Sequence, residues 1–323
     1  MNYIVFDLEW NQPLSRESEE PRMPFEIIEI GAVKLDSKLN IVDEYSSIVR
    51  PRLYKKLQPH IKQILNYDEK FLKSGRPFDV VCREFVKWCG EEEYIFCTWG
   101  SMDLYYLQNN MDYYYMRKLV SPLKYINIQQ LYADIVSDDG SIVKLEKAVA
   151  NLNIQVEENR PFHSAVSDAY YTSQVFKQII PKDIEDRYSY DTYNLPEDSD
   201  HEIISYHKGY MEHISRAVDE KTDIMGDKEF MTLRCYKCKK KTTKKIKWFA
   251  NTQGSYLCVG RCWYHGHIMG KIRFKQTRDE KVFAIKTITP ISKKNVEEVK
   301  QRQEELRIRR QEKRHNKSKT APL

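Results

Sequence analysis

Short apolar runs that suit β-strands open the chain. The first covers residues 3–10, and two more follow at 26–35 and 41–49. Each run is rich in β-branched and aromatic residues and is bounded by polar or turn-forming residues, as strands are. The polar segment 36–40 between the second and third runs is short and turn-like, which predicts an antiparallel hairpin.

Beyond these strands, the apolar positions change to helical spacing and back again. Apolar residues recur at helical intervals over residues 78–89 and form one stripe. The segments that follow are predicted as a strand at 94–99, a helix from Asp103, a strand at 125–128, and helices at 145–152 and 165–180. This order predicts a mixed α/β sheet with helices on its faces.

The chain changes character after Pro181. A polar, acidic connector runs to about residue 200, and residues 203–218 are predicted to form a helix. Residues 232–289 suggest short strands punctuated by Cys, Gly and Lys, whereas 293–319 have helical propensity but almost no apolar face. We therefore expect an α/β domain at 1–181, an acidic linker and helix at 182–231, a small basic module at 232–289 and a basic, flexible tail at 290–323.

Charge is divided sharply along the chain. From residue 232 onward there are 26 Lys and Arg against 7 Asp and Glu, a formal charge of +19, whereas residues 1–231 carry 27 basic and 40 acidic residues, or −13. A basic segment of this density predicts a polyanionic partner, nucleic acid first, with a tail that only aids solubility as the alternative. No run of about 18 apolar residues occurs, which excludes a membrane helix, and the N-terminus lacks signal-peptide features, so a cytoplasmic protein is expected.

Three acids fall where predicted strands end or helices begin. Asp7 and Glu9 are two apart on the first strand, so their side chains leave the same face, about 6.6 Å apart along the backbone. Two such acids repel each other, and a divalent cation would balance their charge. Asp103 follows the strand at 94–99, at the start of a helix. Each of these acids alone also fits a solvated strand end or an ordinary first helical turn.

A histidine and a fourth acid follow the chain-breaking Pro161. His163 and Asp168 are five apart, and on one continuous helix they would point to different sides. Their side chains can converge if His163 lies on the loop, Ser164 caps the helix and Asp168 lies in its first turn.

Four carboxylates and one imidazole form the set that two-metal hydrolysis of a phosphodiester needs. Carboxylates can hold two cations about 4 Å apart, and the ions lower the pKa of an attacking water and stabilise the transition-state charge. Hard oxygen ligands favour Mg²⁺ or Mn²⁺. A neutral imidazole suits the proton transfer. The sequence therefore predicts a metal-dependent phosphodiester hydrolase.

The segments that carry these residues resemble the motifs of the DEDDh group of 3′→5′ exonucleases, which share an RNase H-like fold. They are Phe6-Asp7-Leu8-Glu9, Thr98-Trp99-Gly100-Ser101-Met102-Asp103 and His163-Ser164-Ala165-Val166-Ser167-Asp168. The strand at 26–33 is also typical of that group, and the resemblance covers about residues 1–181. It implies that Asp7, Glu9 and Asp168 hold the catalytic metal, with Asp7 bridging to a second ion. It also implies that Asp103 acts on the second ion, largely through water, and that His163 is the general base.

Within the group, two stretches resemble the branch of histone-mRNA and small-RNA exonucleases and bacterial KapD-like proteins. They are Trp99-Gly100-Ser101-Met102-Asp103 and Ile126-Asn127-Ile128. This resemblance implies RNA as the substrate.

The cysteines of the basic module have the spacing of metal ligands. Cys235 and Cys238 form a Cys-x₂-Cys pair, and Cys258 and Cys262 form a Cys-x₃-Cys pair, with nineteen residues between the two pairs. The two pairs resemble a zinc ribbon, because zinc takes four such ligands in a tetrahedron and a segment this small lacks the apolar area to fold unaided. Since the second gap is unusual, either His265 or His267 could replace one thiolate. Unpaired structural thiols are the alternative.

Candidate substrate contacts combine aromatic and basic side chains. Trp10 is a candidate platform for a 3′-terminal base, with a packed tryptophan at the sheet edge as the alternative. In the basic module, the candidates are Lys239, Lys240, Lys244, Lys245 and Trp248. Such lysines would contact any phosphate backbone and read little sequence.

The sequence thus predicts an RNase H-like α/β exonuclease domain joined to a zinc-ribbon-like basic module. We expect hydrolysis from the 3′ end of nucleic acid, preferably single-stranded RNA, with two Mg²⁺ or Mn²⁺ and a structural Zn²⁺. The alternatives are a DNA exonuclease of the repair or proofreading type and a nucleic-acid-binding adaptor on a vestigial nuclease fold. The basic tail could also dock on ribosomes or another ribonucleoprotein, which would leave the chemistry unchanged.

Overall fold

The chain forms two compact units. The computed structural model describes residues 1–65, 69–137, 141–181, 184–207, 209–251, 254–277 and 279–319. The first unit is Met1–Asn194 and the second is Leu195–Leu323. No helix in the described ranges is long and apolar enough to cross a membrane.

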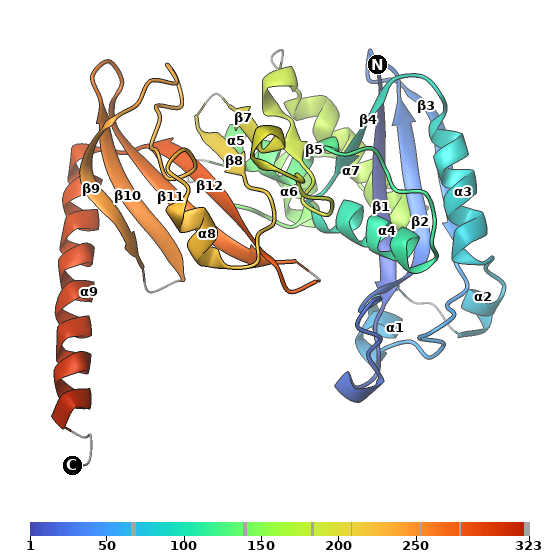
Figure 1. Ribbon diagram of the computed structural model, residues 1–323. Helices are drawn as coiled ribbons and strands as arrows, with labels where there is room; N and C mark the ends of the chain where they lie inside the picture. The colour runs from blue at the N-terminus through green and yellow to red at the C-terminus, as the bar shows by residue number, and fades with distance from the viewer. Residues whose placement is uncertain are drawn as a thin grey trace. The chain divides into compact units, whose positions relative to one another are not determined.

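A six-stranded mixed sheet is the centre of the first unit. Its strands are β1 (Asn2–Asn11), β2 (Glu26–Leu35), β3 (Ile41–Ile48), β4 (Tyr94–Thr98), β5 (Lys124–Asn127) and β6 (Ser189–Tyr190). They lie in the order β3-β2-β1-β4-β5-β6, and Figure 1 labels the first five of these strands. β1 pairs antiparallel with β2 and parallel with β4, and β4 pairs parallel with β5. The predicted α/β sheet and its hairpin are therefore confirmed.

Helices cover both faces of this sheet. They are α1 (Pro59–Leu65), α2 (Glu69–Lys73), α3 (Phe78–Cys89), α4 (Met102–Tyr113), α5 (Ile128–Ile135), α6 (Leu145–Asn151) and α7 (Ala165–Ile179), with a short 3₁₀ helix at Arg16–Ser18 and another at Ile184–Arg187. Alternate residues of β1 enter two separate cores, as strand geometry requires. Tyr3 and Val5 pack with residues of α5, α6 and α7, whereas Ile4 and Phe6 pack with α3 and α4.

The second unit is built on a six-stranded antiparallel sheet. Its strands are β7 (Ile203–Tyr206), β8 (Met211–Ile214), β9 (Thr243–Ala250), β10 (Ser255–Cys262), β11 (Gly266–Gln276) and β12 (Val282–Pro290), with helices α8 (Lys221–Gly226) and α9 (Lys293–Lys319) and a 3₁₀ helix at Ser199–His201. The order is β7-β8-β12-β11-β10-β9 (Figure 1). This sheet is larger than the predicted module at 232–289.

Two predictions for this half of the chain were wrong. The segment 203–218 is not a helix, because Ile203 and Ser205 are buried and Ile204 is exposed, which is the two-residue period of a strand. β8 then pairs with β12, so the region predicted as a linker at 182–231 contributes strands to the second sheet.

The basic segment after the sheet is a helix that packs, rather than a flexible tail. Val296, Val299 and Leu306 lie at helical spacing on one side of α9 and contact apolar side chains of β9 and β10. The guanidinium of Arg310 also donates a hydrogen bond to the carbonyl of Ala250, at 2.7 Å. Three apolar residues among many charged ones make a stripe too narrow to stand out in the sequence.

Candidate active site

β1 carries the first two acids. Asp7 and Glu9 are both partly buried, and they lie opposite Gly31 and Glu29 of β2 in the antiparallel register. The ladder shifts by one residue immediately after Glu9, between Glu9 and Trp10. Because the two acids are two positions apart on a strand, they share one face of the sheet, as the sequence predicts.

Gly31 allows α7 to reach this face. A Cβ atom on Gly31 would lie 2.0 Å from the backbone nitrogen of Val166, so only glycine lets the first turn of α7 approach so closely. Asp168 lies in that first turn. Carboxylate oxygens of Asp7, Glu9 and Asp168 lie within 4.8 Å of one another. The close approach of helix and strand thus brings together acids that are far apart in sequence.

Asp103 completes the group of acids from a third element. It is the second residue of α4 and is only 5% exposed. The backbone N–H of Leu8 donates a hydrogen bond to its Oδ1 at 3.2 Å. This bond holds the carboxylate against β1, between the positions of Asp7 and Glu9.

His163 lies on the loop before α7, as predicted. Its φ of 67° is in the left-handed region, which is uncommon for a residue with a side chain and is often found at functional sites. Its backbone N–H donates to the carboxylate of Asp168, at 3.3 Å to Oδ2. The imidazole is exposed, and its Nε2 lies 3.8 Å from Oε1 of Glu146 on α6.

Glu29 is a site residue that the sequence analysis did not single out. Ser164 occupies the N-cap position of α7, but its hydroxyl does not cap the helix. Instead the hydroxyl donates to Oε1 of Glu29 at 3.3 Å, and the backbone N–H of Ala165 donates to Oε2 at 3.2 Å. A carboxylate near the first N–H groups of a helix is favourable. Glu29 therefore fixes the start of the helix that carries Asp168.

The four acids lie in surroundings that disfavour their charge. Burial, followed by repulsion from Asp103 and the other acids, raises the pKa of Asp7 well above its ordinary value. Burial and repulsion from Asp168 raise the pKa of Glu9 to about 9. Burial raises the pKa of Asp103 and of Asp168 to about 7. Converging carboxylates with no cationic side chain among the causes of these shifts fit a bound divalent cation.

The two tryptophans predicted to contact substrate are packed against protein. The ring of Trp10 packs against Phe25 and Tyr106, with centroids 6.2 and 5.2 Å away. Trp248 donates from Nε1 to the carbonyl of Met231 at 2.9 Å, and its ring lies over Gly270 of β11. The packed tryptophan given as the alternative for Trp10 is thus the better description of that residue, and Trp248 is packed as well. The four predicted lysines are exposed: Lys239, Lys240, Lys244 and Lys245.

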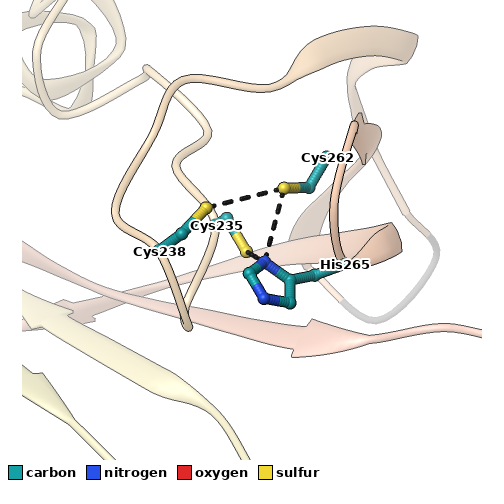
Figure 2. Close-up of side chains that lie close together, drawn as sticks. All are labelled: Cys235, Cys238, Cys262 and His265. Carbon is teal, nitrogen blue, oxygen red and sulfur yellow. Dashed lines mark hydrogen bonds between the residues drawn. The ribbon is translucent and has the colours of Figure 1, made fainter.

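Three cysteines and a histidine of the second unit gather in one cluster (Figure 2). One ligand atom from each of Cys235, Cys238, Cys262 and His265 lies within 4.8 Å of all the others. Nδ1 of His265 is 3.5 Å from Sγ of Cys235 and 3.6 Å from Sγ of Cys262. The sulfurs of Cys238 and Cys262 are 3.6 Å apart. The set is Cys-x₂-Cys and Cys-x₂-His, whose donors suit Zn²⁺.

Cys258 is outside this cluster, which corrects the predicted ligand set. Cys258 and Cys262 both lie on β10, four residues and about 13 Å apart along a strand, too far to bind one ion. Cys258 is buried in the sheet, and burial raises the pKa of its thiol to about 12. Although burial alone would raise the pKa of Cys262, N–H groups of His265 and Tyr264 lower it to about 6. The sequence offered His265 and His267 as alternative replacements for one thiolate. The cluster includes His265, whereas His267 lies on β11.

Comparison with known proteins identifies the first unit. The sequence profile of the exonuclease family RNase T matches residues 4–176. A probable 3′-5′ exonuclease from Bacillus subtilis, KapD, is 32% identical over 108 residues, a match that covers 33% of this chain and 51% of KapD. The chain thus matches about half the length of this curated relative.

Two solved structures resemble part of the fold. One is the nuclease domain of 3′hExo, a DEDDh family member bound to rAMP, at 20% identity and a TM-score of 0.49, over 59% of this chain and 96% of that one. The other is E. coli Exonuclease I with a dT13 oligonucleotide, at 12% identity and a TM-score of 0.46, over 57% of this chain and 42% of that one. On the evidence of the profile match and the motifs, the chain belongs to the RNase T exonuclease family, in its DEDDh group.

Proposed function

We propose that this protein is a metal-dependent 3′→5′ exonuclease that releases nucleotides from the 3′ end of single-stranded RNA. The observation that carries the proposal is the meeting of Asp7, Glu9 and Asp168 within 4.8 Å, with Asp103 held against the same strand. β1, α4 and α7 each contribute to the group, so three elements position one site. Membership of the exonuclease family supports the same chemistry.

The acids are the proposed ligands of two Mg²⁺ or Mn²⁺ ions. Asp7, Glu9 and Asp168 would hold one ion, Asp7 would also bridge to the other, and Asp103 would act on the second largely through water. When bound, the ions lower the pKa of an attacking water and balance charge on the phosphate. The raised carboxylate pKa values support this arrangement, because burial and then mutual repulsion disfavour the charged acids until a cation joins them.

The chain's own residues would orient and deprotonate the nucleophile. His163 is the proposed general base, since an exposed imidazole on a loop next to Asp168 can accept a proton and pass it to solvent. Oε1 of Glu146 lies 3.8 Å from its Nε2 and would help to orient the ring. Glu29 would keep the loop and the first turn of α7 in place through Ser164 and Ala165.

RNA is proposed over DNA because of the motif around Trp99 and Asp103, which resembles that of RNA-degrading relatives. The basic second unit is proposed to hold the strand, because its exposed lysines suit a phosphate backbone. A DNA exonuclease is the second candidate, since the same acids and ions would serve a phosphodiester of either nucleic acid.

A structural Zn²⁺ is proposed for the cluster of Cys235, Cys238, Cys262 and His265. Purified protein should contain one zinc per chain by mass spectrometry of the metal. Cys262→Ser should lose it, and Cys258→Ser, the matched control, should keep it. Equal zinc content in the two variants would count against this ligand set.

The test of the enzyme uses single-stranded RNA and DNA labelled at the 5′ end, with Mn²⁺. The parent should produce a ladder of shortened products, faster on RNA. Asp7→Asn should abolish the ladder, whereas Asp134→Asn, which changes an exposed acid on α5, should not. If the parent binds RNA and DNA but shortens neither, the protein is a nucleic-acid-binding adaptor and the exonuclease proposal fails. If DNA is shortened faster, the substrate proposal fails and the chemistry stands.

A further inference from the structure

Two adjacent aromatic side chains of the second unit are exposed. Trp263 is 89% exposed and Tyr264 is 69% exposed, unlike the packed Trp10 and Trp248. Single exposed apolar residues are ordinary, but here two consecutive residues of one tight turn both expose a large aromatic ring to water.

The cysteine–histidine cluster holds this turn at its base (Figure 2). Cys262 ends β10 and His265 immediately precedes β11, so both residues that flank the two rings belong to the cluster. Sγ of Cys262 lies 3.6 Å from Nδ1 of His265 and 3.6 Å from Sγ of Cys238. Gly266, with a φ of 77°, returns the chain to the sheet. The backbone that carries the rings is therefore fixed, while the rings point away from the fold.

The surroundings of the turn are positively charged. Residues 230–278 contain 13 Lys and Arg and no Asp or Glu. Lys237 lies within the Cys-x₂-Cys segment and Lys239 and Lys240 directly follow it; all three are exposed, and Nζ of Lys240 lies 5.0 Å from the ring centroid of Tyr264. A ligand with both negative charge and flat aromatic faces would match this surface. An unpaired nucleic-acid strand has both, because its bases are free to stack on aromatic rings.

We propose that the turn 262–265, the aromatic turn, binds an unpaired nucleic-acid strand by stacking bases on Trp263 and Tyr264. Lys239 and Lys240 contact the phosphates beside those bases. The inference rests on the proposed function in that the strand is the exonuclease substrate. It differs from the sequence prediction in its aromatic residues, because Trp248 is partly buried and its ring packs against other apolar side chains of the second unit.

The test measures binding without degradation. The full chain carrying Asp7→Asn is titrated into a fluorescein-labelled single strand of about 16 nucleotides, the upper end of common site sizes, and anisotropy is recorded at several salt concentrations. Trp263→Ala with Tyr264→Ala should raise the Kd about tenfold or more. Trp263→Phe should keep most of the affinity. Tyr115→Ala, which removes an 84% exposed aromatic of the first unit, is the matched control and should change little.

Salt dependence separates stacking from charge. The double aromatic variant should keep the slope of log Kd against log salt, because it removes no cation. Lys239→Gln with Lys240→Gln should reduce that slope by about 1.4, at about 0.7 for each phosphate contact on a single strand. Unchanged zinc content in each variant shows that the turn is intact.

Three results would overturn the proposal. The first is a Kd that the double aromatic variant leaves unchanged. The second is an equal loss for a blunt duplex of the same sequence, whose bases are not free to stack. The third concerns phosphatidylglycerol vesicles: the parent binds them, and the double aromatic variant no longer binds them but still binds the single strand. Cleavage by the parent is measured separately, so loss of the exonuclease and loss of the aromatic turn give different results.

Discussion

Removing the buried charge of Asp103 should stabilise the metal-free protein. Asp103→Asn keeps an oxygen that can accept the N–H of Leu8, which is 3.2 Å away in the parent, but it carries no charge. In the folded parent, burial raises the pKa of this carboxyl from 3.8 to about 7. Such a shift favours the neutral acid in the fold and therefore penalises folding whenever the carboxyl is ionised.

The size and pH range of the effect follow from that shift. The pKa of Asp103 is higher in the folded than in the unfolded protein. The ionisation of this carboxyl therefore does not destabilise the fold below pH 3.8, and its penalty grows as the pH rises to about 7. One pKa unit corresponds to about 1.4 kcal/mol, so the penalty at pH 8 is on the order of 4 kcal/mol. At pH 5 the folded carboxyl is mostly protonated, and the penalty is on the order of 2 kcal/mol.

Urea unfolding followed by circular dichroism measures this difference. Parent and Asp103→Asn are compared at pH 5 and pH 8 in buffer without Mg²⁺ or Mn²⁺ and without chelator, so that the second unit keeps its metal. The midpoint of the variant should exceed that of the parent at pH 8, and the gap should narrow at pH 5. Asp134→Asn, at an exposed position, should stay within about 0.5 kcal/mol of the parent. A variant no more stable than the parent at pH 8 would show that the buried charge of Asp103 does not destabilise the metal-free fold.

Three further substitutions test the approach of α7 to β2, the cap on α7 and the packing of α9. Gly31→Ala should displace α7 and abolish RNA shortening, because its Cβ would meet the backbone of Val166 at 2.0 Å; normal activity would show that α7 can shift without loss. Glu29→Ala should lower cleavage and cost about 1 kcal/mol in urea unfolding through loss of the cap on α7. Leu306→Ala should destabilise the second unit by about 2 kcal/mol or more, whereas Ile308→Ala, on an exposed position of α9, should not; equal effects would contradict the packing of α9.

The fold of the first unit can be predicted from the sequence because the patterns that indicate its strands, helices and loops each lie within a few consecutive residues. Asp7 and Glu9 share a face by the strand period alone, and the loop before α7 is marked by Pro161. The contribution of Glu29 is not local. Its carboxylate is buried, and only the packing of β2 against α7 shows that it replaces Ser164 as the cap.

In the second unit, the predicted secondary structure and metal ligands are wrong where strand pairing in the folded protein, and not the local sequence pattern, decides the structure. Ile203 and Ile204 suit a helix or a strand, and the pairing of β7 with β8 decides between them. Cys258 has a ligand-like spacing, but its place on a regular strand separates it from Cys262. Trp263 stands beside a cysteine in the sequence, and only the fold shows that its ring is exposed.

The most direct test of the proposed site is Mn²⁺ binding followed by electron paramagnetic resonance in the presence of adenosine 5′-monophosphate. We expect two bound ions per chain whose signals are broadened by mutual coupling, since the ions would lie about 4 Å apart. Asp7→Asn should lose the coupled pair, because Asp7 is the proposed bridge. A parent that binds no Mn²⁺, or an Asp7→Asn protein with the same coupled signal, would contradict the account.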